Sequence, residues 1–421
     1  MRPAPAPPSP QPSARSGVRA PRVDIFCTVV DNYGDAGVSW RLARRLATGY
    51  GAAVTLWIDD VAPLARMAPG VALATAAADA PAAAGITVRP RADVTLVLPP
   101  DADGAAAASP GAIAASPPDV VIDAFGGGAP DAYVEAMARC DSPPRWFVLE
   151  YLSAEAWVEE SHGLPSPHPR LPLLRRFWFP GFTARTGGLL REPGLLAARD
   201  LFRADAAARD ALWRRVGVPA PAAAELRLTM FCYPNPYLPA LLAAWARSPQ
   251  PVACLVPEGV AAGALDAWTG GRVPRVGDGG HTRDALTVHA VPFLPQDDYD
   301  RLLWAADVNF VRGEDSFVRA QWAGRPFVWQ AYPQEGGAHF AKLDAFLGRY
   351  APRFGPGAEA AIRGLFRVWN GAPAAGAVAD AWDGFVRARG KADAGDDAWA
   401  AELAGLPELA DGLAKASGFG L

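Results

Sequence analysis

Short apolar runs alternate with helical stretches through the first half of the chain. Each run is rich in Val, Ile, Leu or Phe and ends at turn residues, a pattern typical of strands that are covered on both faces. Helical patterns follow the first run, at 38–51, and the fourth, at 131–140. This alternation predicts an α/β fold with an open parallel sheet. The expected strands are 23–30, 52–60, 92–99, 119–128 and the beginning of 145–160.

The same alternation starts again after a charged helical segment, at which we place a domain boundary. Both halves are therefore expected to be Rossmann-like domains. The expected strands of the second half are 226–233, 252–258, 286–293, 307–312 and 326–332. The expected divisions are a disordered tail at 1–22, a first domain at 23–190, a linker at 191–221, a second domain at 222–400 and a C-terminal helix at 401–421 that can pack back on the first domain.

The stretch 307–334 is predicted to form strand, turn, helix, turn and strand. Gly313 permits a tight turn with unusual backbone angles, and Asp315 or Ser316 is expected to cap the helix that follows. A strand that leads through a turn into a helix N-terminus presents backbone N–H groups to phosphate. We therefore expect this turn to face a ligand.

Two acids in that turn, Glu314 and Asp315, stand beside Arg312. Acids repel a bare phosphate, so they should have another task, such as capping the helix, binding sugar hydroxyls or binding a cationic partner. An ordinary helix cap with a surface ion pair explains the same residues, because such caps are common.

The turn after the first strand is also acidic. Asp31, Asn32, Tyr33 and Asp35 lie at the carboxyl end of that strand, the edge at which parallel sheets carry their sites. The segment DNYGDAG lacks the full GxGxxG pattern, so it indicates a dinucleotide site only weakly. Either acid, taken alone, is equally consistent with a turn or cap residue.

The helix after this turn is predicted to be amphipathic. Its apolar positions suit one packed face, and Arg41, Arg44 and Arg45 are expected to point outward.

Composition excludes several classes of function. The 421-residue chain is 51% hydrophobic and 20% charged, with a formal net charge of −4. Such a chain is globular and has no general attraction for nucleic acid. The tail lacks the apolar core of a signal peptide, and the alanine-rich runs are too interrupted to span a membrane. We expect a cytoplasmic protein.

The sequence gives little support for a metal site or for a catalytic cysteine. The four cysteines are scattered, with no CxxC or Cys/His spacing typical of zinc. The DYD at 298–300 resembles a metal-binding DxD, but its place early in a helix favours a structural role. His162 and His168 fall in a loop and are not assigned to catalysis.

Two successive α/β domains, each with a ligand-facing strand edge, imply a central cleft between them. This is the layout of GT-B nucleotide-sugar glycosyltransferases, although other two-domain nucleotide enzymes share it.

Five segments together resemble one family, the elongation factor P maturation arginine rhamnosyltransferases. The segments extend over both domains, and none of them is a generic fold motif. The acidic loop and the RGEDS turn show no departure from the family pattern, whereas the tail and the alanine-rich inserts do. The segments are VVDNYGDAGVSWRLARRLA, EYLSAEAWVEESHGLPSP, FWFPGFTARTGGLLRE, VPFLPQDDYDRLLWAADVNFVRGEDSFVRAQWAGRPFVWQAYPQ and KLDAFL.

The resemblance implies a donor, an acceptor and a set of site residues. The donor is dTDP-β-L-rhamnose and the acceptor is an arginine side chain of elongation factor P. Transfer inverts the sugar in a GT-B enzyme that requires no metal or other cofactor. The first domain is on the acceptor side, and the second binds the nucleotide sugar. The implied essential acids are Asp31, Asp35 and Glu314, and the implied donor contacts are Tyr233, Phe293, Gln296, Asp315 and Ser316.

The chemistry of the acceptor suits these acids. Arginine is protonated at neutral pH, so its nitrogens are poor nucleophiles until a carboxylate binds the guanidinium and takes a proton. We expect Asp35 to be the base and Asp31 to orient the acceptor, although both acids could equally clamp it. Glu314 would face the rhamnose hydroxyls or the acceptor cation.

The implied donor contacts suit a thymidine diphosphate. Backbone N–H groups near Ser316 can stabilise the leaving diphosphate, Phe293 offers a face for thymine, and Gln296 can bond its edge. Phe293 and Tyr233 are also consistent with ordinary residues at strand ends.

Two other functions remain open at this point. One is a GT-B enzyme with another nucleotide sugar or a small-molecule acceptor. The other is a non-catalytic protein that binds elongation factor P and escorts it.

Overall fold

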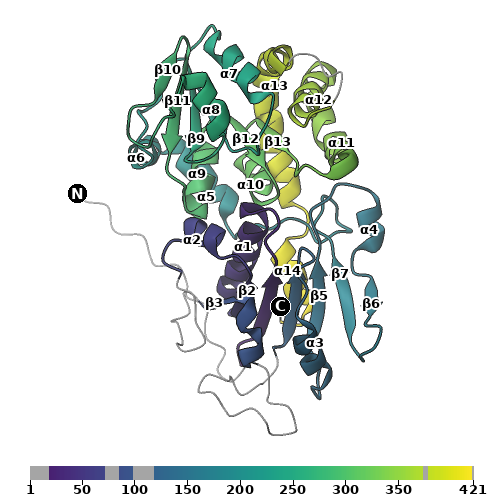
Figure 1. Cartoon of the computed structure of the whole chain (residues 1–421). Helices are drawn as coiled ribbons and strands as arrows, with labels where there is room; N and C mark the ends of the chain where they lie inside the picture. Colours follow the sequence, from purple (N-terminus) through teal and green to yellow (C-terminus); the bar gives the residue numbers. More distant parts are fainter. Residues whose placement is uncertain (1–18, 72–84, 98–117, 373–377, 420–421) are drawn as a thin grey trace, which may run out of the picture.

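The computed structural model describes residues 19–71, 85–97, 118–372 and 378–419. Most of the expected N-terminal tail, residues 1–18, lies outside the described residues, and Arg22 already belongs to the first strand. Two sheets form two lobes joined by long helices (Figure 1). No helix among the described residues is long and apolar enough to cross a membrane.

The first sheet has seven strands in the order β3-β2-β1-β4-β5-β7-β6. Neighbouring strands are parallel except β6, which pairs antiparallel with β7 at the edge. The central strand β1 is almost wholly buried, as its apolar run predicts. The strands are β1 Arg22–Cys27, β2 Ala53–Ile58, β3 Ile86–Pro90, β4 Val120–Ala124, β5 Arg145–Leu149, β6 Pro165–Pro167 and β7 Leu174–Trp178.

The second sheet has six strands in the order β10-β11-β9-β8-β12-β13. Only β10 is antiparallel, so the turns after β8 and β12 open at one edge of the sheet. The strands are β8 Leu226–Met230, β9 Val252–Pro257, β10 His281–Arg283, β11 Leu286–Val291, β12 Val308–Arg312 and β13 Phe327–Gln330.

Helices cover both sheets and connect the lobes. Those of the first lobe are α1 Tyr33–Tyr50, α2 Ala62–Met67, α3 Asp131–Ala138 and α4 Trp157–Ser161. The connection consists of α5 Leu195–Ala204 and α6 Ala206–Arg215. The second lobe contains α7 Leu238–Ala246, α8 Ala262–Thr269, α9 Gln296–Ala305, α10 Asp315–Ala323, α11 His339–Tyr350 and α12 Pro356–Trp369.

The C-terminal helices return the chain to the first lobe. Helix α13, Val378–Ala404, runs from the second lobe toward the first (Figure 1) and crosses position 400 without interruption. Helix α14, Leu409–Ala416, then packs on α1, where Leu413 joins the core of the first sheet. Asp411 and Glu408 pair with Arg45 of α1. The last helix is therefore fastened to the first.

Three local predictions are wrong. The apolar run at 92–99 was expected to be a strand, but Arg91–Val97 is a 3-10 helix and the edge strand is the preceding Ile86–Pro90. Helix α1 begins at Tyr33 rather than at 38, so the acidic turn is partly helical. The arginines of α1 do not all point outward, because Arg41 and Arg45 are buried. Amphipathic spacing cannot show that a second lobe and a C-terminal helix cover the polar face.

Candidate active site

The candidate site lies where the N-termini of α1 and α10 meet. These helices follow the inner strands β1 and β12, so each begins at the carboxyl edge of its own sheet. Gly313 has a φ of 62°, and a Cβ there would lie 2.2 Å from an oxygen of Asp31. A Cβ on Gly37 would lie 3.1 Å from the Cβ of Asp315. The expected tight turn at Gly313 is thus present, and glycines allow the two turns to approach closely.

Asp31 forms a buried ion pair across the two lobes. One of its carboxylate oxygens accepts a hydrogen bond from Arg312 of the other lobe. Burial raises the pKa of Asp31 to about 6, and Arg312 opposes the rise. In this state Asp31 already binds a guanidinium, the chemical group of the expected acceptor.

Aromatic rings surround that guanidinium. The Arg312 carbon Cζ lies 4.5 Å from the ring centre of Tyr233, 4.7 Å from that of Phe231 and 5.4 Å from that of Tyr33. Such cation–π contacts favour a planar cation between ring faces. Arg312 therefore occupies an aromatic cage closed by one carboxylate.

Asp35 is held by its own turn. Its Oδ2 accepts the backbone N–H groups of Val30 and Asp31, each at 2.8 Å. Burial raises the pKa of Asp35, although these backbone bonds oppose the rise. Asp35 is therefore rigid and more basic than an exposed aspartate, and both properties suit a general base.

Glu314 lies next to both acids of the first turn. Its side chain accepts the backbone N–H of Leu152 at 3.1 Å, a contact that crosses from one lobe to the other. Burial raises the pKa of Glu314 to about 8; Lys342 opposes this rise, whereas Asp35 and Asp31 add to it. The three acids are thus electrostatic neighbours, and Glu314 is mostly protonated at neutral pH.

The expected helix cap is wrong, because neither Asp315 nor Ser316 occupies the N-cap position. Glu314 does, without a side-chain capping bond. The Ser316 hydroxyl donates to the carbonyl of Arg312 and accepts the Arg312 N–H at 3.1 Å. Asp315 accepts from Arg41 Nε at 2.8 Å and from Gln296 Nε2 at 3.4 Å. The bonds of Ser316 stabilise the turn, and those of Asp315 connect α10 with α1 and α9.

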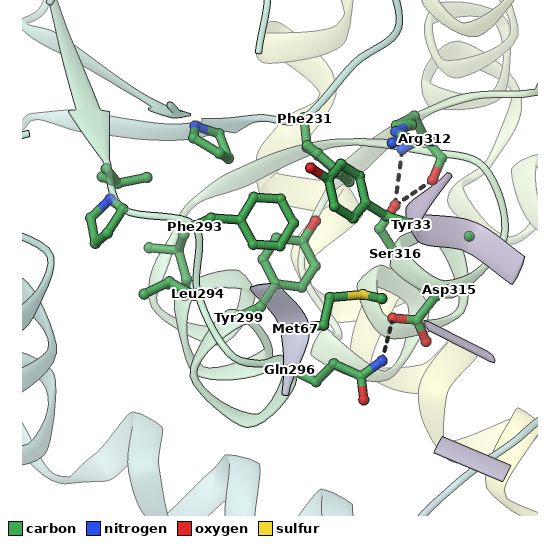
Figure 2. A pocket seen from close by; sticks show the side chains of 15 residues that line it. Tyr33, Met67, Phe231, Phe293, Leu294, Gln296, Tyr299, Arg312, Asp315 and Ser316 are labelled. Carbon is green, nitrogen blue, oxygen red and sulfur yellow. Dashed lines mark hydrogen bonds between the residues drawn. The ribbon is translucent and has the colours of Figure 1, made fainter. Parts of the chain in front are cut away.

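Tyr33 packs against Phe293 with the two rings tilted by 33° and their centres 4.5 Å apart (Figure 2). These rings border a narrow pocket of about 40 Å³, which Gln296, Asp315 and Ser316 also line. On their other side is a groove of about 910 Å³, to which both lobes contribute. The groove has the volume of a site for a small organic molecule, and the narrow pocket does not.

The structure brings the predicted site residues together in two groups. Asn32 and Tyr233 line the groove with Asp31, Tyr33 and Phe293, whereas Gln296, Asp315 and Ser316 lie behind Tyr33 and Phe293. Gln296 Oε1 is buried without a hydrogen-bond partner among the described residues, so this atom can receive a ligand. The Tyr233 hydroxyl instead interacts with Asp31 and Arg312. Asp35 and Glu314 line neither pocket, but both lie within electrostatic reach of Asp31.

Comparison with known proteins identifies the family. A sequence model described as Elongation-Factor P (EF-P) rhamnosyltransferase EarP matches residues 23–417. The chain belongs to this family. The resemblance based on the motifs is therefore confirmed.

Relatives named protein-arginine rhamnosyltransferase include one from Pseudomonas putida, which is 49% identical over 82% of this chain and 86% of its own length. One from Pseudomonas aeruginosa is 43% identical over 93% and 97% of the two chains.

A solved structure described as the structural basis for EarP-mediated arginine glycosylation of translation elongation factor EF-P is 34% identical to this chain. It covers 95% of this chain and 99% of its own, with a TM-score of 0.65. A glycosyltransferase from Rickettsia africae is 8% identical, covers 95% and 97%, has a TM-score of 0.50 and is similar in fold alone. The expected GT-B fold is confirmed.

The DYD acids and the loop histidines have structural partners in this EarP-family chain. Asp300 binds Arg41 and Arg319, and Asp298 pairs with Arg215 and Arg301. Within the described residues no group of three or more His, Cys, Asp and Glu is arranged to hold a metal ion. Nδ1 of His162 accepts the Phe179 N–H, and Nδ1 of His168 accepts two N–H groups of its own loop.

Two features of the EarP-family site escaped prediction from the sequence. Phe231, which completes the aromatic cage, precedes Tyr233 by two positions, so alternation along a strand could have placed it on the same face. Arg41 had no such signal, because its partner Asp315 is 274 residues away.

Proposed function

We propose that the chain transfers L-rhamnose from dTDP-β-L-rhamnose to an arginine side chain of translation elongation factor P, with inversion at the sugar and without a metal. The family and the names of the relatives support this function. The observation that carries the mechanism is the convergence of Asp31, Asp35 and Glu314 beside the N-terminus of α10.

The acceptor arginine enters the groove beside the first lobe. Asp31 and the rings around it already bind one guanidinium, that of Arg312, which supports this place for the acceptor. Asp31 orients the acceptor. The positive charge of the acceptor guanidinium lowers the pKa of Glu314 by Coulomb attraction. Before the acceptor binds, the protonated Glu314 can donate a hydrogen bond to a rhamnose hydroxyl.

The transfer is one displacement. A guanidinium nitrogen attacks C1 of rhamnose and loses a proton to the carboxylate of Asp35. The bond between C1 and the diphosphate oxygen breaks, and dTDP leaves with the electron pair. Attack from the face opposite the leaving group inverts C1. Asp35 suits the base because its turn fixes it and burial raises its pKa.

The donor binds at the second lobe. Backbone N–H groups at the start of α10 stabilise the growing charge on the diphosphate, and the Ser316 hydroxyl adds a donor when it turns away from the Arg312 carbonyl. Thymine lies on Phe293, Gln296 accepts a hydrogen bond with its unpartnered Oε1, and the Tyr233 hydroxyl supplies a further hydrogen bond to the donor. Because Tyr33 covers Phe293 in this structure, the base must displace Tyr33 or stack beside it.

The experiment is an intact-mass measurement on elongation factor P after incubation with the purified chain and dTDP-β-L-rhamnose. A gain of one deoxyhexose, lost when the acceptor arginine is replaced by Lys, is the expected result. Equal transfer in EDTA and an α-linkage by NMR are expected as well. A gain only with another nucleotide sugar, or modification only of a small molecule, would indicate the alternative enzyme. Tight binding without a mass change would indicate an escort protein.

The remaining assignments belong to the same proposal. Residues 23–190 act on the acceptor side and 222–400 bind the donor, with 191–221 as the linker. Elongation factor P and dTDP-rhamnose as substrates place the reaction in the cytoplasm, with no resident cofactor.

A further inference from the structure

Five charged side chains form an ionic cluster between the lobes: Arg41, Glu192, Asp300, Asp315 and Arg319. They come from α1 of the first lobe, the connection before α5, and α9 and α10 of the second lobe. Arg41, Asp300 and Arg319 are each less than 5% exposed. Burying charges is costly unless each is paired, so the function described so far leaves this cluster unexplained.

Arg41 uses its whole guanidinium in the cluster. Its Nε donates to Asp315 at 2.8 Å, Nη2 donates to Asp300 at 2.9 Å, and Nη1 donates to Asp300 at 3.2 Å and to Glu192 at 3.3 Å. Arg319 completes it with two bonds to Asp300 and one to Glu192. A planar fork with fixed donors can hold several carboxylates in one geometry, which an ammonium cannot do.

Asp315 depends strongly on this one arginine. Besides Arg41, the described residues give its side chain one hydrogen bond, the 3.4 Å contact from Gln296. The same Gln296 nitrogen donates to the Gly37 carbonyl of α1 at 3.0 Å. Asp315 and Gln296 line the narrow pocket (Figure 2). A residue of the first lobe thus sets the direction of a carboxylate that opens on the expected donor side of the second.

We propose that Arg41 is a positioning residue of the donor site: without touching the donor, it holds Asp315 in the ionised state and orientation that dTDP-rhamnose requires. The inference rests on the proposed function. It also gives the first lobe a part in donor binding, although the donor contacts expected from the sequence belong to the second.

The charges around Asp315 make the inference sensitive to pH. Arg41 of α1 and Arg319 of α10 favour its ionised form, whereas Asp300 of α9 and Glu192 of the connection oppose it. Tyr299 of α9 also lies nearby. Burial raises the pKa of Asp315, and Arg41 is the strongest opposing influence. Loss of Arg41 should therefore raise the pKa of Asp315 further. As the pH is lowered, donor affinity should then begin to fall at a higher pH than in the unaltered protein.

The test is a double-mutant cycle on donor affinity. Calorimetry with dTDP-rhamnose is carried out on the full chain and on Arg41→Met, Asp315→Asn and the double variant. Each single change is expected to weaken binding about tenfold or more, as for a lost hydrogen bond to a charged group. The double variant should bind like the single ones, because Arg41 acts through Asp315. Arg41→Met should shift the pH profile of donor binding to higher pH, whereas Asp315→Asn should remove this pH dependence, since asparagine does not titrate.

Arg44→Met is the matched control. Arg44 lies on the same helix and pairs with Asp297 at the surface, so its loss should leave donor affinity within twofold. If circular dichroism shows Arg41→Met unfolded, the cycle is completed with Arg41→Lys, which keeps the buried charge but cannot bridge the carboxylates.

The outcomes separate the two proposals. Additive effects, an Arg41 variant with unchanged donor affinity, or an Asp315→Asn protein that binds normally would each overturn the positioning role. Failure of the unaltered chain to bind dTDP-rhamnose at all would instead overturn the proposed function.

Discussion

The two acidic turns of the site hold their carboxylates by different means. In the first turn, Asp35 is fixed by backbone N–H groups from residues four and five positions earlier. In the second turn, Asp315 is fixed by an arginine 274 residues away in the other lobe. The first arrangement survives any movement of the lobes, and the second exists only while the lobes are together. The proposed base is therefore built locally, whereas the proposed donor contact depends on the arrangement of both lobes.

The largest effect is expected from Asp35, which tests whether the locally built acid is the base. Asp35→Asn keeps the shape of the turn but removes the proton acceptor, so kcat should fall about 10²- to 10⁴-fold. Donor affinity should change less than threefold, since Asp35 lines neither the groove nor the narrow pocket. The measurement is transfer rate by mass spectrometry together with calorimetry.

Asp59→Asn is the control for this change. Asp59 follows β2 and accepts the backbone N–H of Val29 at 2.9 Å, so it is another acid at the same sheet edge. Near-normal turnover of Asp35→Asn would show that Asp35 is not the base.

The next largest effect is expected from the ion pair between Arg312 and Asp31, which joins the two acidic turns. Arg312→Met leaves Asp31 buried without its cation, which should destabilise the fold by about 3–5 kcal/mol. Urea unfolding at pH 7 measures the loss. Adding Asp31→Asn should restore part of it, whereas Arg44→Met at the surface should cost about 1 kcal/mol or less. Equal losses of unfolding free energy for Arg312→Met and Arg44→Met would mean that the buried ion pair contributes no more to stability than the surface pair.

A smaller effect is expected from Glu314. Burial raises the pKa of this residue from 4.5 in the unfolded chain to about 8 in the folded protein. Between these values the folded state binds the extra proton, so this group's contribution to stability is complete below about pH 4.5 and falls as pH rises toward 8. Glu314→Gln removes this dependence. Relative to the unaltered protein, its stability should rise by about 3 kcal/mol between pH 5 and pH 8.

Thermal unfolding across that pH range is the measurement. A difference between the two proteins that stays constant with pH would show that Glu314 is ionised throughout.

The smallest effect tests the expected thymine contact. Phe293→Ala should weaken dTDP binding about tenfold, because base–aromatic stacking contributes about 1–3 kcal/mol. Trp157→Ala, an exposed aromatic in α4, should leave dTDP affinity unchanged. Tighter binding by Phe293→Ala would mean that its stack with Tyr33 blocks the site rather than forming part of it.

Prediction from the sequence succeeded where the signal was local. Both strand-to-helix turns were located, because a buried run followed by acids and glycine is readable in a short window. The cap of α10 and the strand at 92–99 were mispredicted, because Asp315 is drawn toward Arg41 instead of its own helix end, and the apolar run forms a 3-10 turn beside an edge strand. At Asp315 a local preference gave way to a tertiary contact.

By itself, the sequence determined two α/β units, acids at the carboxyl edges of their sheets, and the motifs of the family. Only the tertiary structure decided that Asp31 binds Arg312 and that Arg41 reaches Asp315. The physical reason is that an amphipathic helix has the same spacing whether water or another lobe covers its charged face. Which charge meets which is therefore settled only when the lobes come together.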